Sequence, residues 1–103
     1  LAQSSDGVPS SGTFKTSEKL YTACTSTKQA DLDQCNWYLM GAYDMIILYQ
    51  DALQAEKVVC TPTGTLSGAL RTAWLDYLKA SPNARRYSAV STIRNAFTAK
   101  FKC

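Results

Sequence analysis

One stretch of the chain decides the fold: DLDQCNWYLMGAYDMIILYQDAL, residues 31–53. Its candidate buried positions recur at the spacing of a single α-helical face; they are Leu32, Cys35, Leu39, Tyr43, Ile46, Gln50 and Leu53. Asp31 is a natural N-cap for this helix, and Asp33 complements its dipole. We expect one helix over residues 31–57, about 40 Å long at about 1.5 Å per residue.

This helix carries more apolar surface than one stripe holds. Trp37, Tyr38 and Tyr49 flank the main face, which predicts neighbours on two sides. Gly41 either lets another helix approach closely or marks a kink, and we expect close approach.

Helices are also predicted on both sides of this stretch. The first starts at Thr13, ends at residues 25–27, and sets Phe14, Tyr21 and Cys24 on one stripe beside Leu20. A later helix is capped by Thr65, reaches Lys79, and keeps the helical period through Leu66, Leu70, Ala73, Trp74, Tyr77 and Leu78. The last helix follows Ser81-Pro82, with Ser as cap and Pro at its first position, and is expected to bury Tyr87, Val90, Ile93, Phe97 and Phe101.

The remaining segments read as loop and tail. Residues 58–60 resemble a strand, but the turn at 61–64 stops it after three residues and no partner strand is visible. Residues 1–12 are rich in Ser and Gly, which predicts a flexible N-terminal tail. The sequence therefore predicts a single helical domain over residues 13–103, an all-α antiparallel bundle of four to five helices.

Composition limits the function. The 103 residues carry a net charge of +3 and no His, which removes the commonest general base and metal ligand. We therefore expect no enzyme, no metal site and no cofactor. Arg85-Arg86 is the only adjacent basic pair, which argues against nucleic-acid binding. Asp44 interrupts the longest apolar run, so no membrane span is expected.

The four cysteines predict two disulfides. Cys24, Cys35, Cys60 and Cys103 form no CxxC pair, and a zinc site would need all four of these scattered thiolates. A reactive redox cysteine is disfavoured because no basic cluster lies beside any of them. Disulfides imply an oxidising compartment. The chain starts at Leu1 with a polar segment, which fits a secreted protein whose signal peptide has been removed. A chain shortened at this end for another reason would have the same start.

The long helix selects one of the three possible pairings. A disulfide needs Cα atoms within about 7 Å. If one helix covers residues 35–57, Cys35 and Cys60 are about 33 Å apart or more, so they do not pair. The first helix should fold back on the second through a short turn and bring Cys24 near Cys35. We therefore expect Cys24–Cys35 and Cys60–Cys103.

The order of these pieces resembles the Rap/Tai immunity proteins. The resemblance covers about residues 15–103: Cys24, then CNWYLMGAYD (35–44), CTPTGTL (60–66), YLKASP (77–82), and an Ala-rich last helix with a terminal Cys. The family's last turn commonly reads aromatic-Pro-Cys, whereas this chain has Phe101-Lys102-Cys103. The resemblance implies a periplasmic, disulfide-linked helical protein. It also implies a homodimer that plugs the catalytic groove of a cognate peptidoglycan amidase, an effector delivered by type VI secretion.

Two loops are candidates for the inhibitory surface, at opposite ends of the helix after Thr65. Both carry a Pro. We expect residues 81–86 to bind the effector, because a rigid loop with forked donors suits an acidic or carbonyl-lined cleft; the residues are Ser81, Pro82, Asn83, Arg85 and Arg86. The loop at 61–65 is uncharged, and a structural role beside Cys60 suffices for it.

Two further sets of residues allow both a structural and a functional interpretation. Asp31, Asp33 and Asp44 are better explained by helix capping and dipole complementarity than by catalysis or calcium binding. The aromatic set could form core, a dimer interface or a ligand cavity; its members are Trp37, Tyr38, Tyr49, Trp74 and Tyr77. A small carrier of an apolar ligand in the bacterial envelope therefore stands as the alternative to an immunity protein.

Overall fold

The computed structural model of the protein describes residues 13–53 and 56–103. These contain the α-helices α1 (Ser17–Cys24), α2 (Gln29–Ala52), α3 (Ser67–Ala80) and α4 (Ala89–Lys100), with a short 3₁₀ helix, η1 (Pro82–Arg86), between α3 and α4. Within these ranges there is no strand, only two isolated β-bridges. The predicted all-α fold is confirmed. The predicted tail, residues 1–12, lies outside the described residues.

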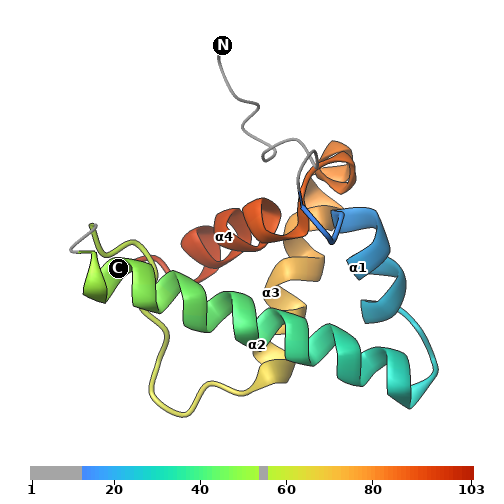
Figure 1. The fold of residues 1–103 in the computed structure, drawn as a ribbon, viewed down its shortest axis with the longest axis horizontal. Coiled ribbons are helices and arrows are strands. Elements are labelled where there is room, and N and C mark those ends of the chain that lie inside the picture. The colour runs from blue at the N-terminus through green and yellow to red at the C-terminus, as the bar shows by residue number, and fades with distance from the viewer. Residues whose placement is uncertain (1–12, 54–55) are drawn as a thin grey trace.

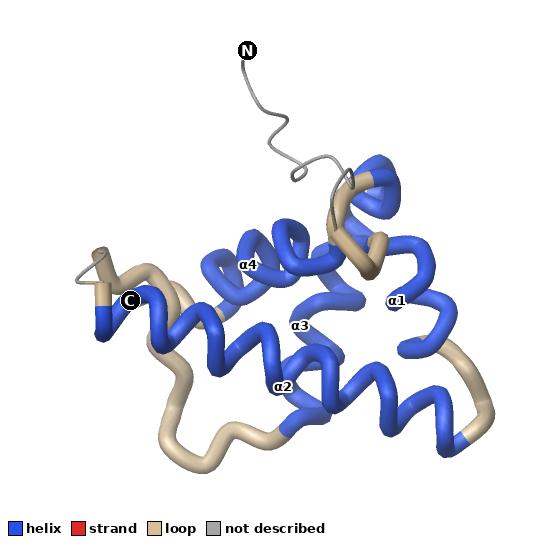
Figure 2. Tube along the Cα trace, in the orientation of Figure 1, coloured by secondary structure: helices blue, strands red, loops and turns tan. Residues whose placement is uncertain are grey.

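Helix α2 is the longest element, and the others pack against it (Figure 1). In that view α3 rises behind α2 and crosses it steeply, α4 lies above the second half of α2, and α1 lies beside its first half. Figure 2 shows the long loop, described from residue 56 onward, that leads back to the start of α3. At 24 residues and about 1.5 Å each, α2 is about 36 Å long.

The helices begin later or earlier than predicted. Helix α1 starts at Ser17, where the hydroxyl of Thr16 accepts a hydrogen bond from the Lys19 amide at 3.1 Å. Phe14 precedes the helix and is fully exposed, so its placement on the α1 stripe was wrong. Helix α2 reaches back to Gln29 with Lys28 at the N-cap position. The predicted cap Asp31 instead lies in the first turn.

The predicted cap of α3 was also wrong. The N-cap position is Leu66, which has no side-chain cap. The hydroxyl of Thr65 donates to the carbonyl of Pro62 at 2.6 Å. Its side chain therefore closes the preceding turn and is not available to the helix.

Helix α2 stops at Ala52, five residues short of the predicted end. The buried amide of Gln50 explains where the chain goes next. Its Oε1 accepts from the amides of Val58 and Val59 at 3.0 and 2.8 Å, and its Nε2 donates to the carbonyl of Val59 at 3.2 Å. These bonds hold the returning chain against the last turns of α2. Leu53, predicted on the buried face, is 68% exposed because it lies past the helix end.

The core lies where α2, α3 and α4 meet. Cys35, Leu39, Ile46 and Gln50 of the predicted α2 face are buried, as are Trp74, Ile93 and Phe97. Val90 is 42% exposed, and its predicted burial was wrong. Helix α4 starts only at Ala89, capped by the Ser88 hydroxyl. Its buried face combines small and large residues: Ala89, Thr92, Ile93, Ala96 and Phe97.

Gly41 lies on the exposed side of α2. A Cβ added there would meet no atom within 4 Å outside the helix's own backbone. The expected close approach of another helix was therefore wrong. The helix also continues through Gly41 without interruption (Figure 1).

Both predicted disulfides are present. Cys24–Cys35 joins the end of α1 to α2, and Cys60–Cys103 joins the loop after α2 to the C-terminal residue. The Cα atoms are 5.0 Å apart in each bridge. The backbone supports the second bridge, because the amide of Cys60 donates to the carbonyl of Phe101 at 2.7 Å. The predicted pairing is confirmed.

Candidate functional site

The 81–86 segment forms a separate turn, not the start of the last helix. Pro82 opens η1, and the amides of Ala84 and Tyr87 donate to the carbonyls of Ser81 and Ala84 at 2.9 and 3.1 Å. The chain then becomes extended at Tyr87 before α4 begins. The prediction of one continuous helix from Ser81 was therefore wrong.

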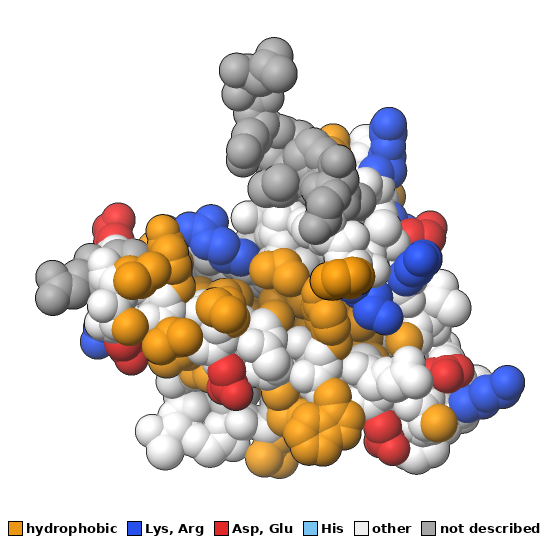
Figure 3. All heavy atoms as spheres, viewed as in Figure 1, with side chains coloured by type: hydrophobic (Ala, Val, Ile, Leu, Met, Phe, Trp, Pro, Cys, Tyr) orange, Lys and Arg blue, Asp and Glu red, His pale blue; other side chains and the backbone are white. Residues whose placement is uncertain are grey.

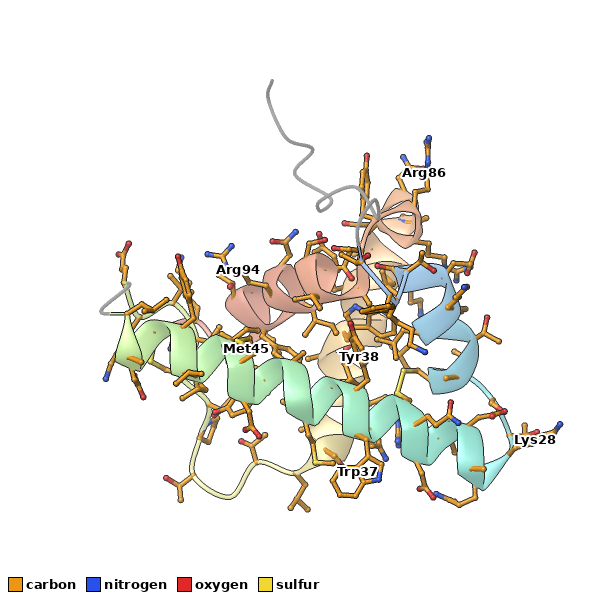
Figure 4. All side chains as sticks on the ribbon, viewed as in Figure 1. Lys28, Trp37, Tyr38, Met45, Arg86 and Arg94 are labelled. Carbon is orange, nitrogen blue, oxygen red and sulfur yellow. A yellow bond between two sulfur atoms is a disulfide. The ribbon has the colours of Figure 1, made fainter. Side chains whose placement is uncertain are left out.

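The turn presents some of its side chains and buries others. Pro82, Asn83 and Arg86 are exposed, and Ser81 is half-buried. Ala84 is fully buried and fastens the turn to the core. Arg86 projects away from the body of the molecule (Figure 4). The exposed edge of the turn thus offers an amide and a guanidinium group.

Arg85 points back to the protein. The carbon at the centre of its guanidinium group lies 3.6 Å from the centroid of the Tyr21 ring, which is a cation–π contact. Its Nη1 lies 4.0 Å from a carboxylate oxygen of Glu18. Sequence reasoning missed this contact, because no local pattern links a residue of α1 to one of η1.

The 61–65 loop lies at the other end of α3 and is tied to α2. The hydroxyl groups of Tyr43 and Thr61 form a hydrogen bond. Gly64 has φ = +85°, a backbone conformation that favours glycine. A groove of about 510 Å³ runs between this loop and α2, with Met40 and Asp44 in its lining.

A second, more apolar groove lies between α2 and α4. It holds about 480 Å³ and is lined by Met45, Ile46, Tyr49, Gln50, Glu56, Val58, Val90 and Arg94. Met45 and Tyr49 are more than half exposed. Figure 3 shows hydrophobic side chains gathered over the last turns of α2 and the adjoining side of α4. In Figure 4, Arg94 lies above Met45 beside this patch.

The aromatic set divides between core and surface. Trp74 is fully buried, Tyr38 and Tyr77 are half-buried, and Trp37 and Tyr49 are exposed. Burial raises the pKa of the Tyr38 phenol above 10.0. Both grooves described above open to solvent. They differ from the enclosed cavity that a carrier of apolar ligands needs.

The acidic residues of α2 do not form a catalytic pair. Asp31 accepts a hydrogen bond from the Ser26 hydroxyl at 2.7 Å, and Asp33 accepts one from Gln29 at 2.8 Å. Asp44 faces the groove beside the 61–65 loop. In the described part of the chain, no group of His, Cys, Asp or Glu residues could hold a metal ion.

The described helices also include none that is both long and apolar enough to cross a membrane.

The fold, the exposed turn η1 and the two grooves define a small, disulfide-bridged helical protein whose candidate sites are binding surfaces. The family model of the Rap1a immunity proteins matches residues 16–103, so the chain belongs to the Rap1a immunity protein family. No curated protein and no solved structure matches it. Membership makes it an immunity protein that binds a cognate secreted effector. Such proteins are generally not enzymes.

Proposed function

We propose that the protein inhibits a peptidoglycan amidase delivered by type VI secretion, in the periplasm, by inserting η1 into the active-site groove of the enzyme. The observation that carries the proposal is the projecting turn, which exposes Asn83 and Arg86 on a backbone fixed by Pro82 and buried Ala84. Family membership supports the inhibitory role. Two disulfides suit an oxidising compartment.

The chemistry of the turn fits a narrow polar cleft. A loop whose shape is fixed before binding loses little conformational entropy on insertion. The guanidinium of Arg86 offers several donors in a planar fork, which match carboxylates and carbonyls. The Asn83 amide adds a donor and an acceptor. Ser81 and Pro82 would line the base of the inserted turn, and Arg85, which stacks on Tyr21, would support the turn from the side of α1.

The 61–65 loop is the competing inhibitory segment. Two of its three threonine hydroxyl groups make contacts within the protein, Thr61 with Tyr43 and Thr65 with Pro62. A loop of this kind serves well as a connection between α2 and α3. It also lacks charged side chains.

A pair of matched loop replacements tests the proposal. Residues 83–86 are replaced by Gly/Ser in one variant and residues 63–65 in the other, and both are checked for helicity and for the absence of free thiols. The partner is the amidase encoded beside the gene of this protein, first tested by co-elution and then by hydrolysis of purified peptidoglycan. We expect only the 83–86 replacement to abolish inhibition. Full inhibition by that variant, with loss in the 63–65 variant, would select the other loop.

The groove between α2 and α4 supports a homodimer. Met45, Tyr49 and Val90 leave apolar surface exposed there, and the rim carries both Glu56 and Arg94. Opposite charges on one face allow a twofold contact in which each charge faces its opposite on the other copy.

Sedimentation at micromolar concentration tests the dimer. We expect a species of twice 11.3 kDa, which Met45→Glu converts to monomer. Leu66→Glu is the control, because Leu66 is 76% exposed but does not line this groove. A wild-type protein that sediments only as monomer refutes the dimer.

A further inference from the structure

The turn η1 is fastened to the N-terminal part of the chain at its C-terminal end. The amide of Ser17 donates to the carbonyl of Tyr87 at 2.9 Å, and the amide of Ala89 donates to the carbonyl of Lys15 at 3.0 Å. These two bonds pair the chain before α1 with the chain before α4. The exit of the turn is therefore held by α1 and the residues that lead into it.

Arg85 makes a second contact from the turn to the same helix. Its guanidinium group stacks on the ring of Tyr21, one turn along α1 from Ser17. The Arg85–Glu18 pair is at the limit of an ion pair, and the Glu18 side chain is 60% exposed, so screening by water leaves it little weight. The ring contact is the stronger one, because Tyr21 is half-buried and its face is partly shielded from water.

A turn this short needs such outside support. Five residues of 3₁₀ helix do not form a stable structure in isolation, because the hydrogen-bond geometry is poor and nucleation is costly. The shape of η1 therefore depends on buried Ala84, on the Tyr87–Ser17 hydrogen bond and on the Arg85–Tyr21 stack. Of these three, the stack is the contact made by the side chain directly before exposed Arg86.

We propose that Arg85 is a positioning residue: by stacking on Tyr21 it locks η1 to α1 and holds Asn83 and Arg86 in the conformation that binds the effector. The inference rests on the proposed inhibitory role of the turn. It assigns different tasks to the two adjacent arginines, since Arg86 contacts the partner and Arg85 fixes the shape. It also makes α1 part of the inhibitory apparatus.

Hydrogen exchange of the free protein tests, without any partner, whether the Arg85–Tyr21 stack holds η1 against α1. Tyr21→Leu removes the aromatic face but keeps an apolar side chain, and Tyr21→Phe restores the face. We expect the amides of Ala84 and Tyr87 to exchange about tenfold faster in Tyr21→Leu, which corresponds to about 1.4 kcal/mol. The amides of α4 should be unchanged, and Tyr21→Phe should match the wild type. Equal exchange at Ala84 in Tyr21→Leu and in the wild type would show that the stack does not hold η1, and would overturn the proposal.

Binding kinetics test the positioning role, with the neighbouring-gene amidase as the probe. If only a fraction of free molecules holds the competent turn, the observed affinity falls by that fraction and the loss lies in association. We expect Tyr21→Leu to associate about tenfold more slowly with an unchanged dissociation rate, and Tyr21→Phe to restore association. A loss confined to the dissociation rate would instead make the site a direct contact and overturn the proposal.

A matched variant distinguishes failure of the positioning role of Arg85 from failure of the proposed inhibitory role of η1. Tyr43→Leu removes a half-buried ring that is tied to the 61–65 loop, and it should leave association unchanged. Slower association in Tyr43→Leu alone would indicate the other loop and overturn both proposals. If the 83–86 replacement abolishes inhibition while Tyr21→Leu binds at wild-type rates, the inhibitory turn stands and only the positioning role of Arg85 is overturned.

Discussion

The hydroxyl of Thr92 connects three elements through one buried atom. It accepts a hydrogen bond from Nε1 of Trp74 in α3 at 3.0 Å and shares another with the Ser17 hydroxyl of α1 at 2.8 Å. Thr92, Trp74 and Ser17 are all completely buried. An indole N–H without an acceptor would then lose its bond to water and gain nothing in return.

Thr92→Val should therefore destabilise the protein. The change keeps the shape of the side chain and leaves Nε1 of Trp74 without its acceptor, at a cost of about 1–3 kcal/mol. Thr98→Val on the same helix is the control, because the buried hydroxyl of Thr98 has no hydrogen-bond partner among the described residues. Urea unfolding should show a loss for Thr92→Val and none for Thr98→Val. Equal effects of the two changes would mean that the network adds nothing.

The phenol of Tyr38 should make the stability of the protein depend on pH in the alkaline range. Burial raises the pKa of its phenol above 10.0 in the folded protein, so folding favours the neutral form. This contribution is complete below the unfolded pKa and is lost as the pH rises through the folded one. The free energy of unfolding should fall above about pH 10, and Tyr38→Phe should reduce that fall. Tyr49→Phe, which changes an exposed ring, serves as control; an unchanged fall in Tyr38→Phe would contradict the assignment.

Residue patterns predicted buried positions well and special contacts poorly. Helical spacing placed Leu39, Ile46 and Phe97 correctly, because burial on a helix follows a fixed period. Capping preferences failed at Asp31 and Thr65, where the side chains found other partners, the Ser26 hydroxyl and the Pro62 carbonyl. The Arg85–Tyr21 stack joins residues far apart in the chain, so no local signal could show it.

At the scale of elements, α2 is an uninterrupted helix with a glycine on its exposed side. Gly41→Ala should raise the free energy of unfolding by about 0.5–1 kcal/mol, because alanine has the higher helix propensity and a Cβ there meets no atom within 4 Å outside the helix backbone. Gly64→Ala should lower it by about 1 kcal/mol, since Gly64 has positive φ. Thermal or urea unfolding measures both. A loss of stability in Gly41→Ala would show that this face of α2 is covered in solution.

The ends of elements depend on tertiary contacts that the local sequence does not encode. Apolar periodicity extended α2 to residue 57, but the buried amide of Gln50 binds the returning chain at Val58 and Val59. The break between η1 and α4 likewise follows from pairing with the chain at Lys15 and Ser17. The existence and order of the helices could be predicted; where each one stops could not.

At the scale of the whole molecule, the two disulfides close loops of different size in different places. The Cys24–Cys35 bridge spans a sequence separation of 11 and the Cys60–Cys103 bridge one of 43. Loop entropy assigns them about 3 and about 4 kcal/mol. The long predicted helix was enough to give this pairing from sequence, because a rigid rod keeps Cys35 and Cys60 apart. The predicted helix gave no information on which bridge supports the turn η1.

The bridges should therefore rank differently for stability and for inhibition. Replacing Cys60 and Cys103 by Ser should cost more unfolding free energy, because that loop is longer. Replacing Cys24 and Cys35 should cost more inhibition, because it releases the end of α1, and α1 carries the Tyr21 and Ser17 contacts that hold η1.

Both double variants should be compared at a temperature where each is fully folded, with unfolding free energy and amidase inhibition measured on the same samples. If inhibition falls in the same order as stability, the turn does not depend on the attachment of α1 to α2. The opposite order would connect the Cys24–Cys35 bridge to inhibition through the position of α1, since Cys60 and Cys103 lie in the loop after α2 and at the end of the chain, whereas α1 lies beside the first half of α2 (Figure 1).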